Sequence, residues 1–362
     1  MVKAVVVSAP GAEPGAREIV VPPVGPGQVR VRVVAAGVCH SDLSMINGTF
    51  APDFPIVLGH EASGRIVEVG DGVRDVAVGD GVVVNWAPAC RECWFCQHDE
   101  PWLCARVEGV VSPPGGELDD GTTLHRCLGV GAFAEELVLP ERSVVPVPSG
   151  VPLDLAALLG CAVLTGVGAV RNTAGVRPGE SVLVIGQGGI GLSTVLGAHL
   201  AQAEPIIAVD VSAEKEALAR RAGATHFLVS EPKLSKQVRL LTDGRGVDHA
   251  FECVGRADTI RQAWTSARRG GACTVVGVGG KDQQVVFNAL ELFHFARRLS
   301  GSIYGSSDPD RDIPALCKHI RDGELDIGTL VTHRVGIDGV PAAFERMRTG
   351  VGARSLIVLD AR

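Results

Sequence analysis

A short stretch early in the chain, residues 39–42, carries a thiol, an imidazole, a hydroxyl and a carboxylate in succession. Such groups bind zinc or transfer protons. Two later segments add candidate ligands, because Gly59-His60-Glu61 supplies an imidazole and Gly160-Cys161 a thiol. Cys39, His60 and Cys161 would leave the fourth position of a tetrahedral zinc open for a substrate. By spacing alone, Cys161 is better explained as a thiol packed in the core, and Cys39 as a buried cysteine beside a turn.

Four more cysteines lie close together in the sequence: Cys90, Cys93, Cys96 and Cys104. Four thiolates at this spacing can close a tetrahedron around zinc without a regular scaffold. Since all four positions would be protein ligands, we expect this zinc to be structural. A zinc ribbon that binds nucleic acid is the main alternative, and the acidic residues Glu92, Asp99 and Glu100 disfavour it.

A glycine-rich turn, Gly186-Gln187-Gly188-Gly189-Ile190-Gly191, matches the dinucleotide-binding pattern. Its context fits, because an apolar run precedes it, a helical pattern follows, and Asp210 ends the next apolar run. Gly186 allows the tight turn, Gly188 the approach of a pyrophosphate, and Gly191 close packing of helix and strand. A carboxylate at Asp210 favours NAD over NADP, because it repels a 2′-phosphate. The alternative is a glycine turn in an unrelated α/β protein.

The elements that must position these groups change in character along the chain. Residues 1–150 contain short alternating runs separated by glycine turns, which indicates antiparallel strands in a barrel or sandwich. Residues 105–131 are polar and turn-rich, which predicts a long loop. Beyond residue 152, strands alternate with helices, which predicts a parallel sheet. We expect helices at 153–170, 190–203, 213–222 and 340–347, and strands at 181–185, 206–210, 247–252, 271–276 and 355–359.

Bulk properties limit the choice of function. A chain of 362 residues favours two domains. A net charge of −7 makes nucleic acid an improbable partner. We find no apolar run of the roughly 18 residues that a membrane span needs, and no layout of a signal peptide at the N-terminus. We therefore expect a cytoplasmic protein, in which ten cysteines point to metal binding or catalysis rather than to disulfides.

Taken together, the chain resembles zinc-dependent members of the medium-chain dehydrogenase/reductase superfamily, the alcohol dehydrogenase family. The motifs that carry the resemblance are residues 37–42, 59–61, the four-cysteine loop, 160–166, the glycine turn with Asp210, and 354–355. The family implies a GroES-like β-barrel catalytic domain, here residues 1–165 completed by 303–362. It also implies a Rossmann domain with a doubly wound parallel sheet, residues 166–302, together with NAD and two zinc ions per chain.

The resemblance also implies roles for individual residues. Cys39, His60 and Cys161 resemble the ligands of the catalytic zinc, and the four-cysteine loop resembles the structural zinc site. Ser41 resembles the hydroxyl that takes the substrate proton, Asp42 the carboxylate that orients the histidine ligand, and Glu61 an acid near the metal. The corresponding cofactor contacts are His40, Arg354, Lys215, Thr165, Ile190, Gly189, Val254 and Val278. Trp86 and Phe133 would line the substrate pocket.

The implied activity is hydride transfer between a primary or secondary alcohol and NAD. Segments 84–86, 101–104, 128–135 and 158–161 are most similar to actinobacterial mycothiol-dependent formaldehyde dehydrogenases, so oxidation of a hydroxymethyl thiol adduct is the alternative. A non-catalytic, zinc-stabilised binding module is a third interpretation. Ser44 stands where classical members often carry a relay histidine. The proton then reaches water through Ser41, the nicotinamide ribose and Ser44, or His40 takes the place of that histidine. The long loop after Cys104 is similar to that of dimeric members, and we expect a homodimer, with a tetramer as the alternative.

Overall fold

The computed structural model describes residues 1–107 and 110–359, which fall into two compact units. Unit 1 comprises Met1–Cys161, Asp308–Gly323 and Val331–Arg362. Unit 2 comprises Ala162–Ser307 and Glu324–Leu330. The chain therefore passes from one unit to the other at 161/162 and 307/308, where the sequence suggested 165/166 and 302/303. The short return of 324–330 to unit 2 was not predicted.

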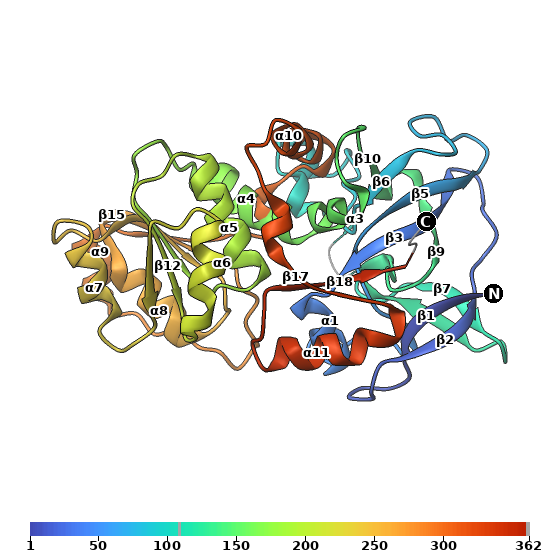
Figure 1. Cartoon of the computed structure of the whole chain (residues 1–362), viewed down its shortest axis with the longest axis horizontal. Helices are drawn as coiled ribbons and strands as arrows, with labels where there is room; N and C mark the ends of the chain where they lie inside the picture. Colours follow the sequence, from blue (N-terminus) through green and yellow to red (C-terminus); the bar gives the residue numbers. More distant parts are fainter. Residues whose placement is uncertain (108–109, 360–362) are drawn as a thin grey trace. The chain divides into compact units, whose positions relative to one another are not determined.

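Unit 1 contains two β-structures (Figure 1). The first is a closed barrel of β1 (Val2–Val7), β2 (Gly15–Val20), β7 (Pro114–Leu118), β8 (Thr123–Arg126) and β4 (Ile56–Val57). The second is a sheet in the order β10 (Val144–Pro146), β6 (Gly81–Val84), β5 (Glu61–Val69), β3 (Gln28–Gly37), β18 (Arg354–Val358) and β17 (Val331–Val335), with β9 (Glu136–Pro140) also paired to β3. Most of these pairs are antiparallel, as the alternating runs predicted.

The central strand of this sheet is β3, and its alternation explains the core. Val29, Val31 and Val33 are at most 1% exposed, whereas Arg30 and Arg32 point to the other face. Apolar residues at every second position bury one face of the strand, because successive side chains point to opposite sides. The C-terminal strand β18 pairs antiparallel with β3, and Figure 1 shows it in red beside the blue β3. The metal-binding segment 39–42 follows directly from β3.

The prediction of a long loop at 105–131 was wrong in part. Residues 114–126 form the hairpin of β7 and β8, in which Glu117 pairs with Thr123. The strands escape detection because their sequences, PGGEL and TLHR, contain few apolar residues and two glycines. Gly115 packs against the Arg126 side chain, which occupies the position of its missing Cβ. The part of that prediction on residues 108 and 109 lies outside the described residues.

The predicted helix at 153–170 is broken at Cys161. It consists of α3 (Leu153–Ala156), the 3-10 turn η4 (Ala157–Gly160), α4 (Ala162–Gly168) and the π-helical segment η5 (Ala169–Ala174). Gly160 explains the break, because a Cβ there would lie 2.7 Å from the Val84 carbonyl oxygen. The close approach to β6 holds the chain where Cys161 leaves helical geometry, at φ −146° and ψ −75°.

The remaining helices of unit 1 are short or lie at its edge. They are α1 (His40–Ile46), α2 (Trp94–Gln97), α10 (Pro309–Arg321), α11 (Val340–Arg348) and the 3-10 turns η1 (Pro101–Leu103), η2 (Cys127–Gly129), η3 (Glu141–Ser143) and η9 (Ile337–Gly339). Of these, α1 matters most for chemistry, because Cys39 stands at its N-cap and Asp42 in its first turn.

Unit 2 is a six-stranded parallel sheet, which confirms the predicted Rossmann class. Its order is β13 (His226–Val229), β12 (Ile206–Asp210), β11 (Val182–Ile185), β14 (Val247–Glu252), β15 (Ala267–Val275) and β16 (Arg298–Gly301). Figure 1 shows α5 and α6 on one side of the sheet and α7 and α8 on the other. The strand order reverses between β11 and β14, and ligands of such sheets bind at that point, beyond the carboxyl ends of the strands.

Unit 2 contains further helices and 3-10 turns. Besides α4 and η5, they are α5 (Gly189–Leu200), α6 (Glu216–Arg221), α7 (Leu234–Leu240), α8 (Ala257–Ser266), α9 (Ala289–Phe295) and the 3-10 turns η6 (Ala213–Lys215), η7 (Tyr304–Ser306) and η8 (Ile327–Leu330). Within the described residues, no single helix is long and apolar enough to cross a membrane. The helices Leu153–Gly160 and Ala162–Ala174 reach that length and composition only as a pair, which bends by 56°.

Candidate active site and zinc centres

Unit 1 brings together three ligand-type side chains from distant parts of the chain. Cys39 follows β3, His60 precedes β5, and Cys161 lies between η4 and α4. Their ligand atoms all lie within 4.8 Å of one another, and the residues are 3%, 1% and 7% exposed. Two thiols and one imidazole in a buried cluster fit zinc, and three protein ligands leave its fourth position free. This geometry favours a ligand role for Cys161 over the interpretation as a thiol packed in the core.

Asp42 forms hydrogen bonds with two residues of this cluster, Cys39 and His60. Its Oδ1 lies 3.2 Å from His60 Nδ1 and accepts the Gly59 N–H at 3.1 Å, while Oδ2 accepts the Cys39 N–H at 3.0 Å. The carboxylate is fully buried. It holds the imidazole in the tautomer that leaves Nε2 for a metal. One carboxylate thus fixes the backbone of one ligand and the ring of another.

Cys127 is a part of this site that the sequence did not reveal. Its thiol is fully buried and lies 3.7 Å from Asp42 Oδ1. Burial is the main reason why its pKa is raised to about 11, so the thiol stays protonated and donates to Asp42. No motif surrounds this residue, and the contact arises only because η2 packs behind α1.

A buried ion pair flanks the cluster. Arg354, at the start of β18, is 3% exposed and donates to the Val38 carbonyl oxygen at 2.8 Å. Its guanidinium also lies 3.4 Å from Glu61 Oε2 and 3.7 Å from Cys39 Sγ. Gly37 makes room for this arrangement, because a Cβ there would lie 1.9 Å from Glu61 Oε1. The predicted contact of Arg354 with the cofactor pyrophosphate stays a prediction.

The electrostatics of the cluster favour a thiolate at Cys39. Its pKa is lowered chiefly by a hydrogen bond from the Cys161 thiol, with further help from Arg354 and His60, and burial opposes the shift. The pKa of Cys161 is raised because its proton serves that hydrogen bond. Burial lowers the pKa of His60, but the Asp42 carboxylate acts with Cys161 and Cys127 in the opposite direction, and the net shift is upward. Cys161 and His60 thus hold protons that a metal would release on binding, whereas Cys39 is already favoured as a thiolate.

The proposed proton-transfer residues lie along α1. Ser41 Oγ is 3.8 Å from Cys39 Sγ, at the edge of the ligand cluster. His40 is exposed, and its carbonyl oxygen accepts the Ser44 hydroxyl at 3.3 Å. Ser44 thus donates its hydroxyl hydrogen within its own helix, and its oxygen lone pairs stay available to accept a proton.

The two predicted pocket residues occupy different environments. The Trp86 ring stands edge-on to the His60 ring, with centroids 6.4 Å apart, which suits a wall of the site. Phe133 is fully buried in the core of unit 1, and its ring lies against Phe344. A Cβ on Gly59 would lie 2.3 Å from Phe133 Cδ1, so this ring supports the His60 loop from inside. The predicted contact of Phe133 with a substrate stays a prediction.

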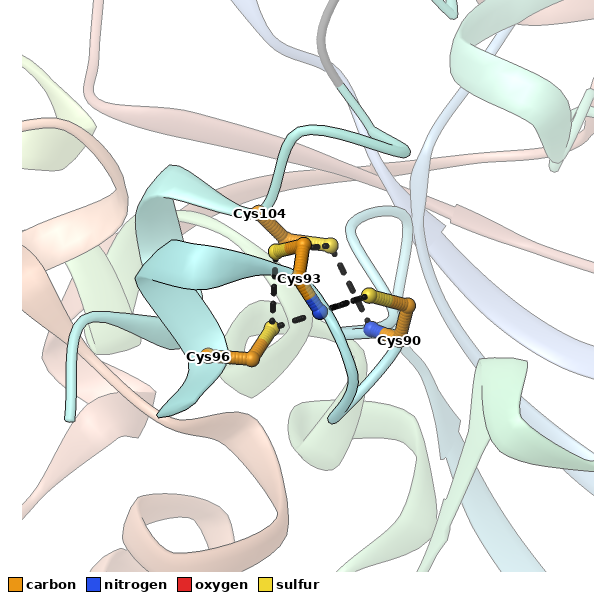
Figure 2. A group of neighbouring side chains, drawn as sticks. All are labelled: Cys90, Cys93, Cys96 and Cys104. Carbon is orange, nitrogen blue, oxygen red and sulfur yellow. Dashed lines mark hydrogen bonds between the residues drawn. The ribbon is translucent and has the colours of Figure 1, made fainter. Parts of the chain in front are cut away.

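The four-cysteine loop forms a second cluster (Figure 2). Three Sγ···Sγ separations are 3.5 Å for Cys93–Cys96, 3.9 Å for Cys90–Cys96 and 3.9 Å for Cys93–Cys104. A tetrahedral zinc with bonds of about 2.3 Å places its sulfurs about 3.8 Å apart. Figure 2 shows all four sulfurs turned towards one point. The set fits zinc and leaves no position for a substrate.

Backbone groups prepare this loop for negative charge. Hydrogen bonds from the N–H groups of Cys96 and Ala105 lower the pKa of Cys93 to about 6. Burial and the neighbouring thiolates raise the pKa of Cys96 to about 12. Arg91, between the first two cysteines, binds both oxygens of Asp308 at 2.7 Å and so ties the loop to the N-terminus of α10. All of these residues belong to unit 1.

The glycine turn of unit 2 has the geometry of a phosphate cradle. Gly186 has φ +91°, and a Cβ on Gly191 would lie 1.7 Å from the Gly186 carbonyl oxygen. At Gly188 the surroundings are open, since no atom of the described residues lies within 4 Å of a Cβ built there. No described side chain caps α5 at Gly188, so its first N–H groups can receive an anion. The turn fits the pyrophosphate of a dinucleotide.

Asp210 ends β12 and contacts the glycine turn. Its Oδ2 accepts the Gln187 N–H at 2.7 Å, and Oδ1 accepts the Ser212 N–H at 3.0 Å. Lys215 is 7% exposed, and burial lowers its pKa although Asp210 and Glu214 act in the opposite direction. A carboxylate oriented by two N–H groups still has lone pairs for ribose hydroxyls.

The other predicted cofactor contacts of unit 2 lie near the same edge of the sheet. Val254 and Val278 follow β14 and β15 and are 42% and 64% exposed. Ile190 is in the first turn of α5 and Thr165 is in α4. Sequence reasoning missed one further segment, η7. In the structure its residues Tyr304, Gly305 and Ser306 all have positive φ. Backbone strain of this kind concentrates at functional sites, and a Cβ on Gly305 would lie 2.8 Å from the Thr165 carbonyl oxygen.

Comparisons with known proteins agree with both units. Residues 25–149 match the family model described as alcohol dehydrogenase GroES-like domain, and residues 189–321 match the one described as zinc-binding dehydrogenase. An S-(hydroxymethyl)glutathione dehydrogenase of Escherichia coli is 37% identical over 98% of this chain and 99% of its own length.

Two solved structures extend the likeness to the fold. An alcohol dehydrogenase zinc-binding domain protein from Burkholderia ambifaria has a TM-score of 0.94 at 30% identity. A benzyl alcohol dehydrogenase from Acinetobacter calcoaceticus has a TM-score of 0.92 at 29% identity. Each alignment covers 99% of both chains. With two zinc-type clusters in one unit and a dinucleotide turn in the other, this chain belongs to the zinc-dependent alcohol dehydrogenase family of the medium-chain dehydrogenases/reductases.

Proposed function

We propose that the protein interconverts an alcohol and its aldehyde or ketone, with NAD as the second substrate. The observation that carries the proposal is the buried, three-ligand cluster of Cys39, His60 and Cys161, whose ligand atoms lie within 4.8 Å of one another. When bound, zinc acts as a Lewis acid towards the alcohol oxygen, and NAD accepts the hydride.

The chain's own residues supply position and proton transfer. Asp42 holds the His60 ring and the Cys39 backbone, so the ligand cluster is preorganised. Ser41 takes the proton of the substrate hydroxyl at Oγ and passes it towards water, directly or through the Ser44 hydroxyl, whose own hydrogen is donated to the His40 carbonyl oxygen. Arg354 and Glu61 keep a buried pair of charges beside the ligands. Trp86 limits the space near His60.

Asp210 supports NAD over NADP. Its carboxylate is fixed by Gln187 and Ser212, and a 2′-phosphate placed there would meet a negative charge. Asp210→Gly should therefore narrow the preference for NAD. An unchanged ratio of NAD to NADP efficiency would contradict the role of this carboxylate.

A second substrate class has support of its own. The Escherichia coli relative at 37% identity is named for S-(hydroxymethyl)glutathione. We propose as the alternative that this protein oxidises the hydroxymethyl adduct of formaldehyde with a low-molecular-weight thiol, because such an adduct presents the same primary hydroxyl to the cluster.

One experiment separates these functions. Primary and secondary alcohols, and formaldehyde, are assayed with NAD by absorbance at about 340 nm, with and without added glutathione or mycothiol. Alcohol turnover without thiol supports the main proposal. Formaldehyde oxidation that requires thiol supports the alternative. A protein that holds one zinc per chain and shows no response to NAD would refute both and leave a non-catalytic module.

We also propose that a second copy of the chain covers the outer edge of β16. Among the described residues this strand pairs only with β15, and an unpaired edge invites another strand. Exposed apolar side chains lie on the segments before and after it in the sequence, including Leu290, Phe293 and Ile303 at 70%, 84% and 54% exposure. Phe293→Glu should convert the dimer to a monomer in sedimentation, and a monomeric wild-type protein would refute this proposal.

A further inference from the structure

Glu252 is a fully buried carboxylate at the carboxyl end of β14. It lies outside the zinc cluster, and no motif of the sequence includes it. A buried carboxylate is costly unless hydrogen bonds compensate for its lost hydration. For Glu252, the segment 253–255 provides most of these hydrogen bonds, and it contains Val254, a predicted cofactor contact.

The side-chain bonds of Glu252 fix the segment 253–255. Oε1 accepts the N–H groups of Val254 and Gly255, both at 2.9 Å, and Oε2 lies 3.1 Å from the Gly255 nitrogen. Thr259, in the first turn of α8, donates its hydroxyl to Oε1 at 2.7 Å. The carboxylate therefore clamps the turn between β14 and α8 at three donors.

The backbone of Glu252 fixes a second segment. Its carbonyl oxygen accepts the N–H groups of Val276 and Gly277 at 2.8 and 3.0 Å. The two segments are in close contact, because a Cβ on Gly277 would lie 2.2 Å from the Gly255 nitrogen. A Cβ on Gly255 would lie 2.5 Å from the Val278 carbonyl carbon. One residue thus holds the turns that follow two neighbouring strands.

Both turns present an apolar side chain to the surface. Val254 and Val278 are 42% and 64% exposed, although the residues that hold them are buried. Val254 also borders the phosphate cradle, since its Cγ2 lies 2.6 Å from a Cβ built on Gly186. Exposed apolar groups held rigidly beside a phosphate site are typical of a preformed ligand wall.

We infer that Glu252 is a positioning residue for the dinucleotide, and that its hydrogen bonds hold Val254 and Val278 in place as two apolar contacts for the cofactor. The inference rests on the proposed use of NAD. It predicts that loosening Glu252 weakens cofactor binding more than it affects the zinc cluster in unit 1.

The test compares Glu252→Gln, Thr259→Val and a matched control, Thr265→Val. Thr265 lies on the same helix, but its hydroxyl donates to Arg261 and Gln262 carbonyl oxygens and not to Glu252. In Glu252→Gln the amide oxygen can keep the three contacts of Oε1, and the N–H₂ group at the position of Oε2 then faces the Gly255 N–H without an acceptor. We expect this mismatch to displace the turn and to weaken NADH binding about tenfold, the effect of one lost buried hydrogen bond. NADH binding is measured by calorimetry, together with zinc content and the melting temperature.

We expect the Kd for NADH to rise about tenfold in Glu252→Gln and less in Thr259→Val, with Thr265→Val like the wild type. KM for NAD should rise in parallel, while KM for the alcohol and the zinc content stay constant. A purely structural role would lower the melting temperature without this selective effect on NAD. Unchanged NADH binding in folded Glu252→Gln, or in Thr259→Val if the former does not fold, would overturn the inference.

Gly188→Ala separates this failure from failure of the proposed function. The Cβ added at Gly188 meets no described atom within 4 Å, so folding should be unaffected, but it would occupy the phosphate cradle. If wild-type protein binds NADH and Gly188→Ala does not, the glycine turn is supported as the cofactor site. The Glu252 variants then test whether Glu252 positions the dinucleotide. If wild-type protein binds no NADH, the proposed function and the inference both fail.

Discussion

Replacing Asp42 with asparagine tests how the candidate catalytic zinc site is held. The carboxylate accepts on one oxygen from Gly59 and faces His60 Nδ1, and on the other oxygen it accepts the Cys39 N–H. Asparagine has a single acceptor oxygen. In one orientation the amide oxygen keeps the Gly59 and His60 contacts, and the amide N–H₂ group faces the Cys39 N–H. In the opposite orientation the oxygen keeps the Cys39 contact, and the N–H₂ group faces Gly59 and His60.

The expected magnitude follows from this mismatch. A buried donor without an acceptor costs about 1–3 kcal/mol. Because the contacts are made by Cys39 and His60, which are candidate zinc ligands, we expect this cost to appear as weaker zinc binding. Changes to groups that orient metal ligands weaken binding by about 10–100-fold, or about 1.4–2.8 kcal/mol. The two ranges agree, and we expect zinc affinity at this site to fall by 10–100-fold on this reasoning.

The assay is zinc retention against a series of competing chelator concentrations, with zinc counted per chain. In Asp42→Asn one zinc should leave at lower chelator concentration than in the wild type, and the zinc of the four-cysteine loop should stay. Ser44→Ala is the control, because Ser44 lies on the same helix and its hydroxyl donates to the His40 carbonyl oxygen and not to a zinc ligand side chain. Equal retention of both zincs in Asp42→Asn and the control would refute the proposed support of His60 and Cys39.

Three further predictions concern other parts of the chain. Cys93→Ser should release the structural zinc and lower the melting temperature by about 10 °C, while the remaining folded protein keeps its zinc at Cys39; an unchanged melting curve would contradict a stabilising role. Gly37→Ala should displace the Glu61 carboxylate and cost about 1–3 kcal/mol of folding free energy by chemical denaturation. Gly336→Ala, where no described atom lies within 4 Å of the new Cβ, is its control and should cost little. Asp248 has a pKa of about 2, because hydrogen bonds from Ser181 and Arg268 outweigh the effect of burial. After allowance for its partial exposure, Asp248→Asn should lose about 1 kcal/mol. A depressed carboxyl pKa stabilises the fold above the ordinary value of 3.8, so the difference in melting temperature should be constant near neutral pH and shrink below about pH 4. A difference that grows on acidification would show the opposite linkage.

The sequence was most informative where a pattern is local. The apolar runs and glycine turn of unit 2 predicted β11, β12, β14 and the start of α5 to within a residue or two. The four-cysteine loop is likewise a single short segment. The broken helix at Cys161 could not be predicted, because it depends on Gly160 touching β6, which lies far away in the sequence.

Contacts across the fold set the limit of prediction at the zinc cluster as well. Cys39, His60 and Cys161 were assigned by resemblance, since their spacing in the sequence is uninformative. Cys127 and Glu252 act on functional groups through a thiol and a carboxylate with no motif around them. Phe133 shows the same limit, because its packing against Gly59 and Phe344 in the core of unit 1 joins residues far apart in the sequence.

The pairing of β18 with β3 has a consequence for biosynthesis. Leu356 pairs with Gly37, so the central sheet of unit 1 joins residues more than 300 positions apart. A nascent chain on the ribosome has made Cys39, His60 and Cys161 long before Arg354 emerges. Unit 2, whose main segment is continuous, can fold during that interval. Zinc that binds at this early stage would meet a sheet that still lacks β18 and the Arg354 guanidinium. The last strand to be synthesised would therefore complete the charge environment of Cys39.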